Sequence, residues 1–455
     1  MVARNGVISA TTRHLTTLAA TLVVLLLGTR GAYAVPSFAQ QTGMPCQQCH
    51  TVAYGPALTD YGRQFKLNGY VFGDNTPLIP LALMVQGGYE HTKADQPDVP
   101  APNYKLNDNL SVDQVSLFVA GRISQHLGLF AQITYDGIGH FITWDNLDLR
   151  YARPFTIGNT AVVAGISVNN NPTVQDLWNS TPAWGFPYIS SALAPAPTAG
   201  TVIGGLAQTV LGATAFVSVD NHYYLEAGGY RGLSANWLDK TGVGRDNSPN
   251  LSGISPYWRA AAQFTHGPHS YSVGTFGLDA SVQPDPTVPL KDRYTDFGFD
   301  ATYQYSGTGR HVVAANASLI HEHQNLGASF AAGGSDAVDN NLQTFGIDLT
   351  YAFQRTWVGA VSAFSTTGTT NAARYAPAAL SGSNSGSPDS TGYTLSAEYV
   401  PFGKLRSYGR PWINLRVGLQ YTAYTKFNGG DANYDGFGRS ASDNDTLFAF
   451  FWAIL

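Results

Sequence analysis

Long apolar runs, charged residues and cysteines are all scarce in this sequence. After the first 34 residues, no segment offers the roughly 18 uninterrupted apolar residues of a membrane helix, which argues against a helical membrane bundle. Charged residues make up 12% of the chain, about half the usual share. This composition suits a protein that shows much of its surface to something other than water. The only two cysteines in 455 residues are Cys46 and Cys49, which could suggest a single disulfide, but their spacing argues for another role.

The first 34 residues are predicted to be an export signal and not part of the fold. They combine a basic start, a short apolar core and the A-x-A cleavage site Ala32-Tyr33-Ala34, so the mature chain is expected to begin at Val35. The whole chain has 25 basic and 30 acidic residues, and removal of the arginine-bearing signal increases the acidic excess. A mildly acidic protein is a poor nucleic-acid binder, and no nucleic-acid partner is expected.

Most of the mature sequence alternates between apolar and polar side chains with a period of two. In one such segment the apolar positions are Phe345, Ile347, Leu349, Tyr351 and Phe353. Segments of about ten residues with one apolar and one polar face are typical of transmembrane β-strands, which have lipid on one side and a polar lumen on the other. We expect sixteen such strands, starting near residues 79, 112, 127, 143, 158, 207, 221, 256, 269, 293, 310, 341, 355, 391, 410 and 444.

A soluble β-sandwich would also alternate, but strand length, aromatic strand ends and connector length favour a membrane barrel. The predicted connectors alternate between short and long, as in bacterial barrels with short periplasmic turns and long external loops. The long ones are residues 92–111, 169–206, 232–255, 324–340, 367–389 and 426–443. The connector 169–206 is aromatic and unusually long, and it either folds into the lumen or covers the outside.

The segment before the strands, residues 35–77, has no sheet pattern and contains Cys46-Gln-Gln-Cys49-His50. In a c-type haem site each thiol adds to one haem vinyl group, and the following histidine binds the iron from below. A redox Cys-x-x-Cys would need a thioredoxin-like context, a structural zinc would need further ligands, and a plain disulfide would leave His50 without a role. The motif therefore predicts one covalent haem c.

The sequence leaves the second axial ligand of that haem open. Met84 and His91 lie in the first predicted strand and are weak candidates, whereas Met44 is expected to pack. A five-coordinate iron or a water ligand is also compatible. Arg63 and Lys66 are close to the attachment site and are either partners of the haem propionates or ordinary solvated charges.

The N-terminal segment resembles the haem segment of the fused cytochrome–porins of the bacterial outer membrane, whose best-known members are iron(II) oxidases. The resemblance is carried by Val35-Pro-Ser-Phe-Ala-Gln-Gln-Thr-Gly-Met-Pro-Cys-Gln-Gln-Cys-His-Thr51, Pro56-Ala-Leu58, Gly62-Arg63 and Phe65-Lys-Leu-Asn-Gly-Tyr70, and further along by Asn171–Trp178 and Thr181–Trp184. One departure is Gln40, where the family usually has arginine. That change could alter the haem environment, but it removes no ligand.

The resemblance implies an all-β fold: a transmembrane antiparallel barrel of sixteen strands over 78–455, plugged by the haem c segment 35–77. It also implies an iron(II):cytochrome c oxidoreductase, which takes electrons from extracellular ferrous iron and passes them to periplasmic c-type cytochromes. Cys46 and Cys49 would hold the haem, and His50 would be its proximal iron ligand. Two alternatives stay open: a porin-type transport channel whose haem senses or gates, and a conduit for a different electron donor.

Overall fold

The computed structural model describes residues 36–72, 79–307, 309–404 and 413–455. The predicted signal 1–34, its cleavage site before Val35 and the predicted boundary at residues 77 and 78 lie outside these ranges.

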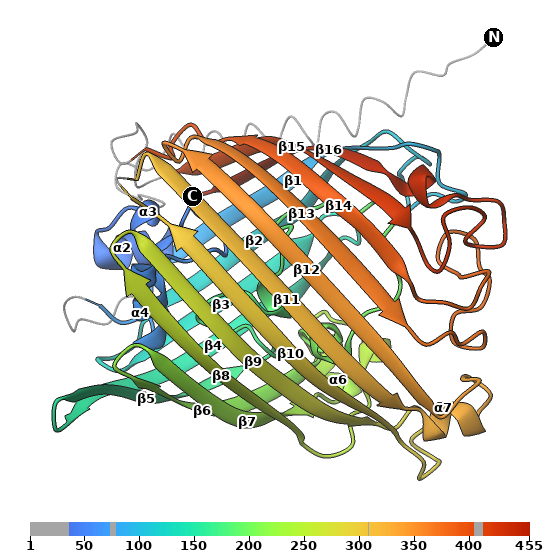
Figure 1. Ribbon diagram of the computed structural model, residues 1–455, viewed down its shortest axis with the longest axis horizontal. Helices are drawn as coiled ribbons and strands as arrows, with labels where there is room; N and C mark the ends of the chain where they lie inside the picture. The colour runs from blue at the N-terminus through green and yellow to red at the C-terminus, as the bar shows by residue number, and fades with distance from the viewer. Residues whose placement is uncertain (1–35, 73–78, 308, 405–412) are drawn as a thin grey trace. The chain divides into compact units, whose positions relative to one another are not determined.

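The described residues form one closed antiparallel barrel in which each strand pairs with its neighbours in sequence and β1 pairs with β16 (Figure 1). The strands are β1 (Leu81–Thr92), β2 (Asn109–Arg122), β3 (Leu127–Asp136), β4 (Phe141–Ile157), β5 (Thr160–Asn169), β6 (Val210–Val219), β7 (Tyr223–Gly232), β8 (Ser255–His266), β9 (His269–Val282), β10 (Asp292–Tyr305), β11 (His311–Asn325), β12 (Asp339–Phe353), β13 (Trp357–Gly368), β14 (Ser390–Tyr399), β15 (Asn414–Lys426) and β16 (Thr446–Ile454).

The predicted sixteen-stranded barrel is confirmed. Its strands separate apolar from polar side chains as the period-two pattern predicts. On β10, Phe297 and Phe299 point outward and are 43% and 52% exposed, whereas Asp296 and Asp300 are buried on the inner face. An outer wall of this kind has its apolar side chains toward lipid, and closure leaves no strand edge unpaired.

Most long connectors lie at one end of the barrel and most short turns at the other, as predicted. One connector at each end departs from this rule. Only residues 137–140 join β3 to β4 at the long-loop end, whereas residues 400–413 join β14 to β15 at the short-turn end. Short helices occur in the loops: α5 (Val202–Gly205), α6 (Ala235–Lys240), α7 (Gly327–Ala331), η1 (Pro182–Trp184), η2 (Arg245–Asn247) and η3 (Ala441–Asn444). Within the described ranges, no helix is long and apolar enough to cross a membrane.

The connector between β5 and β6, residues 170–209, folds into the lumen. Thr173, Gln175 and Asp176 are fully buried, and Trp178 is 4% exposed. The sequence left open whether this connector enters the lumen or covers the outside of the barrel, and in the structure it enters the lumen. The loop packs Leu177 and Trp178 against Phe216 and Tyr224 of the barrel wall.

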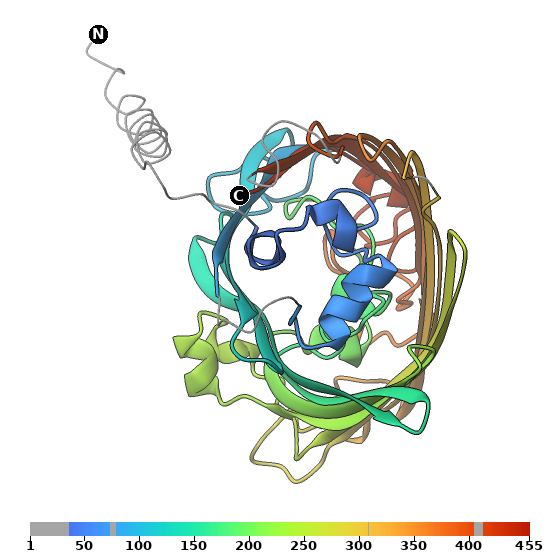
Figure 2. The ribbon, with the colours of Figure 1, turned by 90° about the vertical axis from the view of Figure 1, so that its left-hand side faces the viewer.

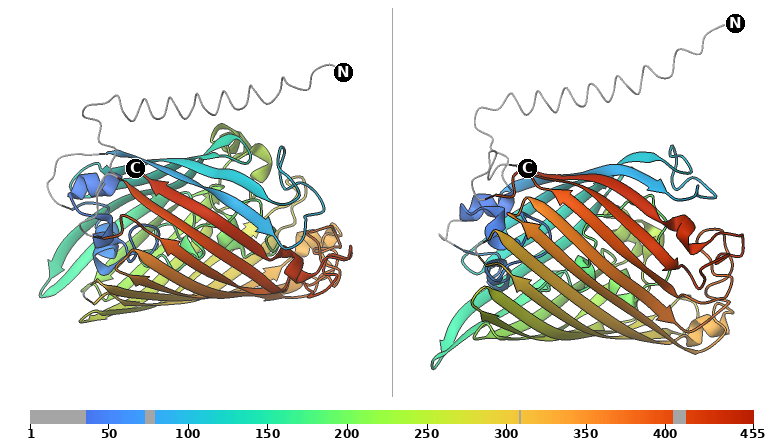
Figure 3. Two further views of the ribbon diagram at one scale, coloured as in Figure 1. Left: turned by 90° about the horizontal axis from the view of Figure 1, so that it is seen from above. Right: turned by 45° about the horizontal axis from the view of Figure 1, so that its top comes forward.

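The N-terminal segment also lies inside the ring of strands. It contains α2 (Ser37–Thr42), α3 (Cys46–Cys49) and α4 (Asp60–Leu67), drawn in blue within the barrel in Figure 2. Figure 3 shows these helices at the end of the barrel opposite the long loops. We refer to residues 36–72 as the plug. The barrel is therefore occupied from one side by the plug and from within by the loop 170–209.

Candidate functional site

The two cysteines and His50 are held by a short, closed turn of the plug. Cys46 and Cys49 begin and end α3, and His50 caps that helix by donating its backbone N–H to the Cys46 carbonyl at 2.9 Å. The chain then folds back, since His50 bridges to Leu58 and the Thr59 N–H donates to the Cys49 carbonyl at 2.9 Å. This geometry presents the three side chains of the motif on one side of α3.

That side faces a cavity of about 470 Å³ inside the barrel, a volume within the range of small-molecule and cofactor sites. Cys46, Cys49 and His50 all line it. Its remaining walls come from the plug, from β1 to β4, from β16 and from the lumen loop, and are largely apolar. Prominent lining residues are Phe38, Phe65, Met84, Phe118, Phe130, Trp184, Tyr188 and Trp452.

The chemistry of the three motif residues suits covalent haem attachment. Cys46 and Cys49 are present as thiols, and burial raises the pKa of Cys49 to about 12. Burial lowers the pKa of His50 to about 4, with a smaller contribution from the charges of Arg416 and Arg355. The imidazole is therefore neutral near pH 7, which is the form that binds a metal. Its Nδ1 is buried and makes no hydrogen bond within the described structure.

Of the two predicted candidates for the second axial ligand, the structure brings only one to the cavity. Met84 lines it from β1 and is 5% exposed. His91 lies seven residues further along the same strand, about 23 Å away at the usual rise per residue. Its Nδ1 contacts the Asp108 carboxylate at 2.8 Å at the exposed rim. Met44, which was expected to pack, also lines the cavity.

Arg63 and Lys66 are not solvated charges, because they are only 2% and 5% exposed. Lys66 lines the cavity, but its ammonium donates to the carbonyls of Val174 and Asp176 at 2.8 and 2.6 Å and to Asn179 Oδ1 at 2.9 Å. All three of its donors are thus used by the lumen loop.

Arg63 does not line the cavity. Its guanidinium pairs with Asp60 and donates to the Leu58 carbonyl at 3.0 Å and to Ser270 Oγ at 2.8 Å. In the structure, Arg63 and Lys66 therefore fasten the plug to the wall and to the loop.

Several residues that hold the plug in place were missed by the sequence analysis. Arg416 on β15 donates to the Tyr54 carbonyl at 3.0 Å and pairs with Glu398 at 2.6 Å. Arg355 donates to the Gln47 carbonyl, and the Gln47 amide donates to the Gly403 carbonyl at 2.9 Å. The three contacts with the plug join residues more than 300 positions apart, and no local pattern in the sequence marks them.

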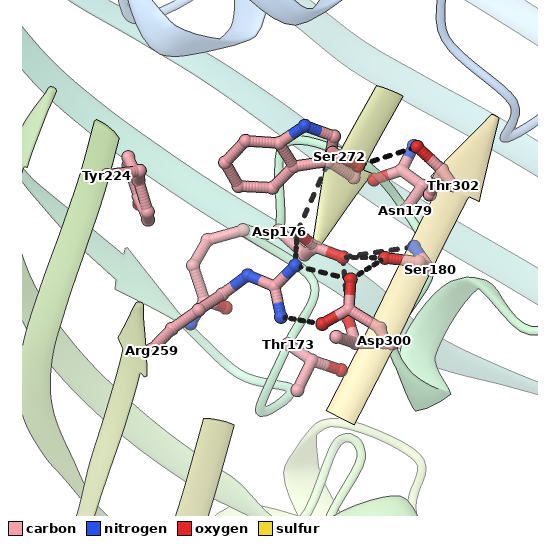
Figure 4. Close-up of polar contacts among 12 residues, drawn as sticks. Thr173, Asp176, Asn179, Ser180, Tyr224, Arg259, Ser272, Asp300 and Thr302 are labelled. Carbon is pink, nitrogen blue, oxygen red and sulfur yellow. Dashed lines mark hydrogen bonds and ion pairs between the residues drawn. The ribbon is translucent and has the colours of Figure 1, made fainter. Parts of the chain in front are cut away.

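The lumen loop is fixed by a buried ion-pair network that the sequence analysis also missed. Arg259 on β8 makes a bidentate contact with Asp300 on β10, with both distances 2.9 Å, and contacts Asp176 of the loop at 3.1 Å (Figure 4). Ser180 Oγ donates to Asp300 at 2.6 Å, and its N–H donates to Asp176 at 3.0 Å. One permanently charged arginine thus joins the loop to the wall.

Among the described residues, no group of three or more His, Cys, Asp or Glu side chains is placed to bind a metal ion.

Comparison with known proteins gives a likeness of fold. No family model and no curated protein sequence matches the chain. OmpT with loop L8 deleted, an outer membrane protein of Vibrio cholerae, is 10% identical over 83% of this chain and 98% of its own, with a TM-score of 0.44. An anion-selective porin from Comamonas acidovorans is 10% identical over 83% and 99%, with a TM-score of 0.44. The outer membrane channel DcaP of Acinetobacter baumannii is 11% identical over 85% and 100%, with a TM-score of 0.42.

The strand pairing establishes the class of protein independently of these likenesses. A closed antiparallel barrel with an even number of strands, an apolar outer face and a polar inner face is the architecture of bacterial outer-membrane proteins. The protein is an outer-membrane β-barrel, and its outer wall contacts membrane lipid.

Proposed function

We propose that the protein is a fused cytochrome–porin that transfers electrons across the outer membrane through a single haem c. The haem is attached to Cys46 and Cys49, with His50 as its proximal ligand. The electron donor is extracellular iron(II), which loses one electron and becomes iron(III). The electron acceptor is a periplasmic c-type cytochrome or similar protein.

One observation carries this proposal: the three residues of the Cys-x-x-Cys-His motif line a common cavity inside the barrel. A bound haem supplies one-electron chemistry at its iron. The chain supplies two anchoring thiols, a neutral imidazole and a largely apolar enclosure. No proton transfer by a side chain is needed for such a reaction.

The lumen loop gives the cavity a second wall. Trp184 and Tyr188 line it from the loop, while Tyr54 and Trp452 line it from the plug and β16. These rings exclude water from the site and favour electron transfer without direct contact between donor and iron. The cations that fasten the plug keep the motif in one orientation relative to the wall.

The second candidate function is a transport channel whose haem senses or gates. It is favoured by the polar inner face of the closed barrel and by the inward loop 170–209, which narrows the lumen. A conduit for another donor would share the fold and the haem and differ only in its redox partner.

Three measurements on the purified, haem-loaded protein separate these functions. Addition of iron(II) should convert the haem absorbance bands to those of the reduced form, and a lack of reduction at the working pH of the organism would exclude iron(II) as the donor. A planar bilayer should show little conductance, and solute-selective conductance without reduction by iron(II) would favour the channel. Covalent haem staining should disappear in Cys46→Ala and Cys49→Ala, and staining retained in both would exclude the attachment.

A further inference from the structure

Two buried carboxylates face each other across neighbouring strands in the lumen. Asp296 on β10 and Glu322 on β11 are directly opposite in register, and both belong to the inner face. They are 2% and 1% exposed. Directly opposed residues of an antiparallel pair have Cβ atoms about 4.5–5.5 Å apart, so the two carboxyl groups are neighbours.

Both carboxylates bind the backbone of the lumen loop. The Ile203 N–H donates to Asp296 Oδ2 at 2.8 Å, and the Val202 N–H donates to Glu322. Gln324 Nε2 donates to the second oxygen of Glu322 at 2.5 Å. Asp296 Oδ1 is buried and receives no hydrogen bond from the described residues. One oxygen of the pair therefore lacks a donor.

No cation compensates this pair among the described residues. The neighbouring strands present leucines in register, Leu278 on β9 opposite Asp296 and Leu342 on β12 opposite Glu322. The charged group that acts on Asp296 is Glu322 itself. The other titratable or charged groups around the pair have partners of their own: Asp292 with Ser329, Asp300 with Arg259, and Arg374 with Tyr294 and Tyr375.

Two ionised carboxylates in this position would repel each other while cut off from water, and only neutral donors face them. A single shared proton resolves both problems. The O–H of one carboxyl donates to the other, which removes one negative charge and supplies the donor that Asp296 Oδ1 lacks. The two loop N–H groups then complete the set of hydrogen bonds.

We propose that Asp296 and Glu322 form a proton-binding site that latches residues 201–206 of the lumen loop to the barrel wall. When the shared proton leaves, it passes to lumen water, and both carboxylates are ionised. They can be hydrated only if the loop segment moves off them, because Val202 and Ile203 cover them in the closed arrangement. The latch acts on the loop and is independent of the haem.

The latch differs in kind from the anchor at the other part of the same loop. Arg259 holds Asp176 with a guanidinium that stays protonated at all accessible pH values. The segment at Ile203 is held by a group that titrates. Because the closed state binds one proton more than the open state, closure is favoured at low pH, and each pH unit above the titration increases opening about tenfold.

Hydrogen exchange on the complete mature protein in detergent micelles tests the latch. Amide protection of residues 201–206, corrected for intrinsic exchange, should fall about tenfold per pH unit on the alkaline side of a titration between about pH 4 and 9, the range of buried carboxyl groups. Asp296→Asn replaces the shared proton with an amide N–H, so protection should persist and lose its pH dependence. Glu322→Gln should behave in the same way, and it provides the same test if Asp296→Asn does not fold.

Asp292→Asn is the matched control. Asp292 is equally buried on the same strand and also binds backbone N–H groups, those of Ala328 and Ser329, but it faces no second carboxylate. This variant should keep the pH dependence at residues 201–206. The proposal would be overturned if amide protection of residues 201–206 in the wild type did not change with pH. It would also be overturned if that protection changed on addition of Mg²⁺ or a chelator at fixed pH. Loss of the pH dependence in Asp292→Asn as well would also overturn it.

Discussion

Gly62 of α4 lies against the backbone of Cys49 in α3, so closely that a Cβ atom on Gly62 would be 2.2 Å from the Cys49 carbonyl oxygen. The two short helices of the plug can pack together only because residue 62 has no side chain. This contact sets the position of Cys49 relative to α4 and to the cavity that α4 helps to line.

Gly62→Ala should therefore separate the two helices. Forcing a methyl group against backbone costs about 1–3 kcal/mol of plug stability, and covalent haem staining should decrease because Cys49 moves. Protease cleavage within residues 36–72 and haem staining measure the two effects. Gly346→Ala is the control, because a Cβ atom added at Gly346 would meet no other atom within 4 Å and both readouts should stay at the wild-type level.

Asp60 should make the plug sensitive to acid. Burial raises the pKa of Asp60, but Arg63 and hydrogen bonds from Thr265 and Ser270 outweigh it, and the pKa lies below the usual 3.8. The unfolded state then binds more protons than the folded state at acidic pH, so this contribution to stability is present above pH 3.8 and is lost as pH falls through the folded pKa.

Asp60→Asn should remove that acid dependence and cost about 1–3 kcal/mol at neutral pH, because buried Arg63 loses its charged partner. Guanidinium unfolding midpoints of the wild type and the variant over about pH 2–7 test whether stability falls with acid as expected. If the unfolding midpoint of the variant fell with acid as steeply as that of the wild type, the acid sensitivity would come from other carboxylates.

Arg259 should contribute far more to the free energy of unfolding than a surface arginine does. Arg259→Met leaves Asp176 and Asp300 as buried charges without a cation, which should cost about 3–5 kcal/mol and expose the loop 170–209. Arg293→Met breaks a pair with Asp279 in which the arginine is 65% exposed, and it should cost about 0–1 kcal/mol. Unfolding midpoints and proteolysis of the loop compare the two variants, and equal losses would contradict the role of the network.

His50→Ala should separate haem attachment from iron ligation. The thiols of Cys46 and Cys49 stay in place, so covalent haem staining should persist, whereas the absorbance bands should shift and return toward the wild type when imidazole is added. His91→Ala should leave both readouts unchanged, because His91 lies at the exposed rim. Bands that are unaffected in His50→Ala would exclude it as a ligand.

The barrel was predictable from the sequence because lipid and lumen impose a period of two on every strand. All sixteen predicted starts lie within four residues of the observed ones. The Cys-x-x-Cys-His motif can also be seen in the sequence, since Cys46, Cys49 and His50 are neighbours along the chain, and its haem stays a prediction. Local patterns of this kind do not depend on what the rest of the molecule does.

Contacts across the lumen could not be predicted in this way. Arg416, Arg259 and Glu322 all occupy inward positions of strands, where a polar residue is expected whatever it faces. Arg416 binds the plug, Arg259 binds the loop by ion pairing, and Glu322 accepts a hydrogen bond from the Val202 backbone N–H of the loop. The partner depends on how two segments without sheet pattern fold inside the ring, and nothing in the strand sequences encodes that.

The seam between β1 and β16 has a consequence for assembly. Tyr54 of the plug donates its hydroxyl hydrogen to the Trp452 carbonyl on β16, the strand that closes the ring against β1. The hydrogen bond thus fastens the plug to the strand that completes the ring. Seating of the plug and closure of the seam are expected to stabilise each other, so loss of one contact should weaken the other.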